Sequence, residues 1–118
     1  MFEADDIREW RGHDVVDPKD HKLGTLESVY VDTATDEPFF ATVTVGLPTR
    51  RRLVFVPLVG ATVGPGYLKV VHPKNLVKQA PSIDTDGVLA AEDEPAVFTH
   101  YGLEYSAGAG GERRLARR

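Results

Sequence analysis

The chain has 118 residues, of which 42% are hydrophobic, enough for one small domain with one core. It has no cysteine, which excludes disulfides, thiolate nucleophiles and cysteine-ligated metal sites. The longest apolar run, residues 53–63, is interrupted by Pro57 and Gly60 and is too short to span a bilayer. Because residues 1–10 are acidic and lack the apolar stretch of a signal peptide, we expect a cytoplasmic protein without membrane insertion.

The net charge of −4 is distributed in three blocks. Residues 1–37 hold eleven acids and four bases, residues 38–81 hold six bases and no acid, and residues 82–118 hold seven acids and four bases. Such blocks occur on partner surfaces, and they also neutralise one another within a fold.

The N-terminal part predicts a short helix followed by two strands. Residues 4–12 place acids in a first turn and a glycine at the end, a pattern typical of a short helix. The β-branched Val15 and Val16 precede a turn cluster at 17–20, which predicts a first strand turning into a second over residues 23–32.

The central part predicts further strands. Residues 39–46 are rich in aromatic and β-branched residues and should form a hairpin with the preceding strand across residues 36–38. Residues 47–52 are expected to be a charged loop before a buried strand at 53–57. Short strands are then expected near 61–63 and 67–71, joined by a hairpin turn at Gly64-Pro65-Gly66.

The C-terminal part changes period. Residues 74–78 predict one helical turn, and residues 90–101 predict a helix with acids at its start and Gly102 after its end. Residues 106–118, rich in glycine and arginine, are expected to form a flexible basic tail. The resulting prediction is a mainly β protein, an all-β barrel with short N-terminal and C-terminal helices.

The motifs that carry a family resemblance lie in the first two thirds of the chain. They are Gly12–Asp17, Lys22–Asp32, Phe40–Val43 and Val56–Leu58. In this order and spacing they resemble the PRC-barrel domain over roughly residues 5–77, and the later segment around 93–103 resembles the C-terminal extension of stand-alone bacterial members. The resemblance implies a small, highly curved antiparallel β-barrel that serves as a binding or assembly module and not as an enzyme. We therefore divide the chain into a barrel domain (1–80), a helical extension that packs on it (81–105) and the tail (106–118).

Two groups of residues are candidates for partner contacts. Trp10, Phe98 and Tyr101 either pack in the core or, if exposed, mark a protein interface, since aromatic residues are enriched in interface cores. A core this small makes self-association, as a homodimer, a plausible source of further burial. Arg50, Arg51 and Arg52 are candidate contacts for an anionic partner, and an RNA- or ribosome-associated adaptor is the alternative function.

A metal-dependent enzyme is the least favoured alternative. His13, Asp17 and His21 are close in sequence, and these residue types bind metals, but their spacing matches no known ligand loop. Turn chemistry explains the same cluster. We expect no catalytic residues, no metal and no cofactor.

Overall fold

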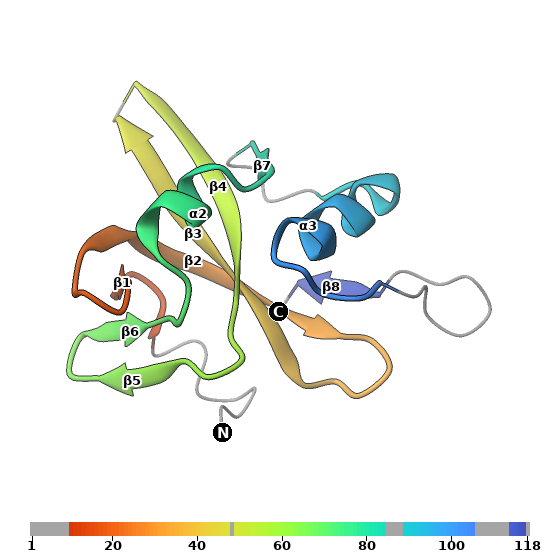
Figure 1. Ribbon diagram of the computed structural model, residues 1–118, viewed down its shortest axis with the longest axis horizontal. Coiled ribbons are helices and arrows are strands. Elements are labelled where there is room, and N and C mark those ends of the chain that lie inside the picture. The colour runs from red at the N-terminus through yellow and green to blue at the C-terminus, as the bar shows by residue number, and fades with distance from the viewer. Residues whose placement is uncertain (1–9, 48, 85–88, 106–113, 118) are drawn as a thin grey trace.

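One mixed β-sheet with two short α-helices forms the described part of the chain (Figure 1). The computed structural model describes residues 10–47, 49–84, 89–105 and 114–117. The strands are β1 (Asp14–Val16), β2 (Lys22–Asp32), β3 (Pro38–Leu47), β4 (Arg50–Pro57), β5 (Thr62–Gly64), β6 (Tyr67–Lys69), β7 (Ser82–Ile83) and β8 (Leu115–Arg117). The helices are α2 (Lys74–Lys78), the 3-10 turn η2 (Ala91–Asp93) and α3 (Glu94–His100). No helix within these ranges is long and apolar enough to cross a membrane.

The sheet differs from the expected antiparallel barrel in two respects. Its strand order is β5-β6-β1-β2-β3-β4-β7, with β8 also paired to β2, and the pairing of β1 with β6 is parallel. The β5–β6 hairpin returns to the sheet with β6 running in the direction of β1, an arrangement that strand propensities alone do not define. Within the described residues the end strands β5 and β7 do not pair with each other, so the sheet is not closed.

The long strand β2 is the centre of this sheet. Its N-terminal part pairs with β1, its C-terminal part pairs with β8, and β3 lies along its other edge. Register shifts interrupt the β1–β2 and β2–β3 ladders, and such irregularities bend a strand and increase its twist. Gly24 lies at a close approach of β2 to β3, since a Cβ added there would lie 2.0 Å from the backbone oxygen of Thr44. The expected β2–β3 hairpin is therefore present.

The loop expected at residues 47–52 is shorter than predicted. β3 continues through Leu47, and β4 begins at Arg50, which pairs with it. Arg51 and Arg52 pair with Gly46 and Val45, so all three arginines belong to a strand. Their backbones complete the ladder while their side chains stay exposed, and exposed charge was the feature that had indicated a loop.

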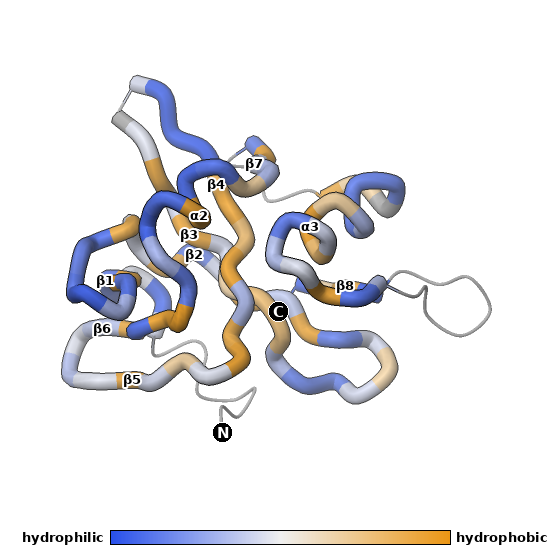
Figure 2. Tube along the Cα trace, viewed as in Figure 1, coloured by the Kyte–Doolittle hydropathy of each residue, from blue (hydrophilic) through white to orange (hydrophobic). Residues whose placement is uncertain are grey.

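An aromatic cluster fills the space between the sheet and α3. Phe40 and Phe55 are fully buried, with ring centroids 6.0 Å apart, and Phe98 of α3 lies 5.2 Å from Phe40. Figure 2 shows the hydrophobic colouring along β3 and β4 where they run past α3. Both expected C-terminal helices are present, as α2 and as η2 followed by α3, whereas the helix expected at 4–12 lies almost entirely outside the described residues.

Residues 114–117 do not behave as the expected flexible tail. β8 pairs with the Tyr30–Asp32 end of β2, and Leu115 is buried in the core. The buried carboxylate of Glu94 accepts hydrogen bonds from the backbone N–H groups of Arg114 and Leu115 at 2.9 and 3.2 Å. These contacts join residues that are far apart in the sequence, so the composition of the segment alone could not reveal them. The other residues of that segment, 106–113 and 118, lie outside the described ranges.

Candidate interaction surfaces

Four large hydrophobic side chains are exposed along consecutive elements of the chain. Val59 follows β4, Val63 lies in β5, Tyr67 lies in β6 and Val71 follows β6, with exposed fractions of 66%, 41%, 36% and 46%. A Cβ added at Gly60 would lie 2.9 Å from the Val71 side chain, so the β4–β5 connection and the segment after β6 are in contact. Val63 pairs with Leu68 and Gly64 pairs with Tyr67, so Val63 and Tyr67 project from opposite faces of the β5–β6 hairpin. We refer to the four residues on this part of the molecule as the apolar surface.

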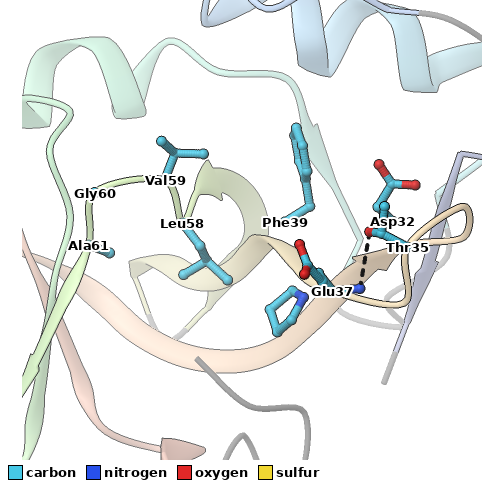
Figure 3. Close-up of a pocket in the computed structure, with 9 residues that line it drawn as sticks. Asp32, Thr35, Glu37, Phe39, Leu58, Val59, Gly60 and Ala61 are labelled. Carbon is cyan, nitrogen blue, oxygen red and sulfur yellow. Dashed lines mark hydrogen bonds between the residues drawn. The ribbon is translucent and has the colours of Figure 1, made fainter. Parts of the chain in front are cut away.

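A pocket of about 430 Å³ adjoins this surface (Figure 3). Phe39, Leu58 and Val59 provide apolar walls, and Glu37 and Asp32 lie at the end nearer the β2–β3 turn. The backbone N–H of Glu37 donates to Thr35 Oγ1 at 3.3 Å, which is the bond drawn in Figure 3. The pocket is thus mainly apolar with acidic groups at one end.

A second pocket, of about 460 Å³, has the opposite charge. It lies between the beginning of β2, the β3–β4 hairpin and α2, and its lining residues are Lys22, Leu23, Val45, Gly46, Arg52, Lys74, Val77 and Lys78. Four of these eight residues are basic and none is acidic. We refer to it as the basic pocket.

Asp17 fixes the position of α2 beside this pocket. Its buried carboxylate accepts hydrogen bonds from the backbone N–H groups of Lys19, His21 and Lys74 at 2.9, 2.8 and 3.2 Å. Burial alone would raise the pKa of Asp17, but these hydrogen bonds outweigh burial and hold the pKa below its ordinary value. The ionised carboxylate of Asp17 therefore links the turn between β1 and β2 to Lys74, the first residue of α2.

The family assignment is decided by a match between the chain and the model of the PRC-barrel domain over residues 2–77. The chain belongs to the PRC-barrel family. The matched range covers well over half of the chain, and it includes β1 to β6 and nearly all of α2. No curated protein matches the chain.

The three arginines at the beginning of β4 lie in different environments in this PRC-barrel protein. Arg52 lines the basic pocket, and its Nη2 donates to the backbone oxygen of Lys78 at 3.4 Å. Arg50 and Arg51 are exposed nearer the end of the hairpin and do not line that pocket. Contact of the three arginines with an anionic partner remains a prediction.

The three aromatic candidates do not form a common exposed patch. Phe98 is fully buried, Tyr101 is 9% exposed, and Trp10 is partly buried against the core. The hydroxyl of Tyr101 donates to the backbone oxygen of Phe55 at 2.5 Å, and burial raises the pKa of this phenol. Phe98 and Tyr101 are therefore core residues of the PRC-barrel protein, because the exposure that an interface role required is absent.

The histidine and aspartate cluster near the first turn is organised by hydrogen bonds. His21 Nδ1 lies 3.2 Å from Asp17 Oδ2, whose carboxylate already accepts the backbone bonds given above. Across the part of the chain that the structure describes, no three histidine, aspartate or glutamate side chains gather as metal ligands.

Sequence reasoning did not place Lys22 with the other basic residues of this pocket. Lys74 and Lys78 were part of the acid-free block, but Lys22 lies in the acidic N-terminal block, 30 residues before Arg52. The spacing of Lys74 and Lys78, four residues apart in a predicted helical turn, is the one signal that places two of them on the same face.

Proposed function

We propose that this PRC-barrel protein is a non-enzymatic binding module that acts through protein–protein contacts, including contacts with a second copy of itself. The observation that supports this best is the exposed apolar surface formed by Val59, Val63, Tyr67 and Val71. Several large apolar side chains exposed on neighbouring elements are characteristic of protein interaction sites, because their removal from water contributes free energy only when a partner covers them.

The sheet edge at β5 supports the same function. β5 pairs with β6 on one side, and its other side has no strand partner among the described residues. An exposed strand edge offers N–H and C=O groups to another chain, and Val63 lies within this edge strand. A partner that contacts the apolar surface is therefore also well placed to pair with β5.

A catalytic role has less support. Two polar side chains of the pocket that adjoins the apolar surface are engaged in local structure, since Thr35 accepts the N–H of Glu37 and Asp32 pairs with Arg114 at 2.7 Å. Membership of the PRC-barrel family favours a binding role for the same fold. An RNA- or ribosome-associated adaptor is the alternative, with the exposed Arg50 and Arg51 as its supporting observation.

Light scattering over a range of concentrations tests self-association. We expect the mass of the wild-type protein to rise toward that of a dimer at high micromolar concentration, and Val59→Asp to abolish the rise because it places a charge in the apolar surface. Thr99→Asp, at an exposed position of α3, is the matched control and should leave the rise unchanged. A strictly monomeric wild-type mass would contradict self-association.

A further inference from the structure

We propose that the basic pocket binds an acidic protein segment that presents an apolar side chain between carboxylates. This site is formed by different residues from the apolar surface, so it is an additional binding site and does not depend on the self-association proposed above. The charge of the pocket, the arrangement of its cations and its apolar floor support this proposal.

The charge of the pocket is largely uncompensated. Lys22 Nζ lies 3.1 Å from Asp14 Oδ1, and this is an exposed pair on the rim. Arg52, Lys74 and Lys78 form no ion pair with an acid in the part of the chain that the structure describes. Three positive charges therefore remain available to an incoming anionic group.

These three cations are brought together by two elements. Lys74 and Lys78 are four residues apart on α2, which places them on one face of the helix. Arg52 projects from β4, and its bond to the Lys78 carbonyl holds the guanidinium beside the end of α2. A guanidinium has five N–H donors, so this single bond leaves most of them for a carboxylate. Figure 2 shows the hydrophilic beginning of β4 next to the hydrophilic α2.

The three cations of the pocket repel one another. Like charges spaced four residues apart destabilise a helix, and Arg52 adds a third positive charge beside them. An anionic group bound between the cations removes this repulsion. Binding should therefore also raise the melting temperature of the protein.

The floor of the pocket selects between kinds of anion. Leu23, Val45 and Val77 line it together with the cations, and the lining residues that the structure describes include no aromatic one. Single-stranded nucleic acids are held by aromatic side chains on which bases stack, and a phosphate alone would leave these apolar groups uncovered. A peptide with carboxylates on either side of a leucine covers the floor and neutralises the rim.

Fluorescence anisotropy with defined probes tests the proposal. The probes are a labelled peptide of alternating glutamate and leucine, an all-glutamate peptide of equal length and a labelled uridine oligonucleotide, each at low and moderate salt. We expect the mixed peptide to bind most tightly, with affinity that falls as salt increases. Arg52→Glu and, separately, Lys78→Glu should each weaken it by about tenfold or more, since each reverses a charge in the pocket.

Arg51→Glu is the matched control, because it makes the same change at the neighbouring residue of β4, outside the pocket. It should weaken the mixed peptide by less than about threefold, as a screened surface charge does. An equal loss in Arg51→Glu and Arg52→Glu, tighter binding of the oligonucleotide, or no binding of the mixed peptide would each overturn the proposal. Circular dichroism of each variant checks that it is folded. Because the readout is peptide affinity and not oligomeric mass, either proposal can fail while the other stands.

Discussion

The carboxylate of Asp17 accepts a hydrogen bond from the backbone N–H of Lys74, which follows it by 57 residues in the chain. This bond joins the β1–β2 turn to α2 and so holds one wall of the basic pocket in place. The same carboxylate organises its own turn through Lys19 and His21. A residue in a predicted turn thus also has a long-range structural role.

The first prediction concerns Asp17 and acid. Because its pKa is lowered in the folded state, the unfolded chain takes up the proton first, near the ordinary aspartate pKa of 3.8. The stabilisation is therefore complete well above that pH and is lost as the pH falls through the lower, folded-state pKa. Asp17→Asn should reduce the urea midpoint at pH 7 and reduce the difference in midpoint between pH 7 and pH 3. Asp14→Asn, at an exposed position, is the control and should change neither appreciably.

The second prediction concerns the attachment of β8. Glu94→Ala leaves the N–H groups of Arg114 and Leu115 without their carboxylate acceptor, and Tyr105 loses its 3.0 Å bond to the same group. We expect a loss of about 1–3 kcal/mol in stability. We also expect faster trypsin cleavage after Arg114, measured by mass spectrometry. The control is Glu92→Ala, on the exposed side of η2, and equal cleavage in the two variants would contradict this role for Glu94.

Much of the sheet could be predicted from local sequence, because its strands are marked by β-branched and aromatic residues. The run from Phe39 to Gly46 is the clearest example. By contrast, β8 and the parallel β1–β6 pair depend on contacts between distant segments: Leu115 pairs with Asp32, and Val15 pairs with Leu68. Such pairings leave no periodic pattern in either segment alone.

The candidate sites were predictable to a smaller extent. Arg52 was identified from its charge, but the pocket that it lines needs α2 and the beginning of β2 beside it. Phe98 and Tyr101 were recognised as important aromatics, yet sequence could not distinguish a core position from an interface. Both limits have one cause, which is that burial depends on elements that come together only in the folded chain.

The third prediction concerns the close approach of β2 and β3. Gly24→Ala would place a methyl group 2.0 Å from the backbone oxygen of Thr44, and a backbone atom cannot move aside as a flexible side chain can. The two strands must then separate locally, and we expect a loss of about 3 kcal/mol in the free energy of unfolding. Gly66→Ala is the comparison, because Gly66 has a φ of +77° but open space around its Cβ position. It should cost about 1 kcal/mol from backbone strain alone. If the two variants lost equal free energy of unfolding in a denaturant titration, the close approach of β2 and β3 would not be the cause of the loss in Gly24→Ala.

The fourth prediction concerns His72, whose ring lies 4.8 Å from that of Tyr101. Burial lowers the pKa of His72, and the positive charge of His100 lowers it further. The unfolded chain therefore binds a proton near pH 6.5 before the folded protein does, so stability falls as the pH drops from about 6.5 toward the lowered pKa and then levels off. This window lies above that of Asp17, so thermal melting between pH 5 and pH 8 separates the two residues. His72→Asn should flatten the pH dependence in this range, and His100→Asn should raise the pKa of His72, as followed by NMR titration of the imidazole. A pKa of His72 at or above 6.5 in the wild-type protein would contradict the assignment, because a partly buried ring near a second histidine takes up a proton less readily than a solvated one.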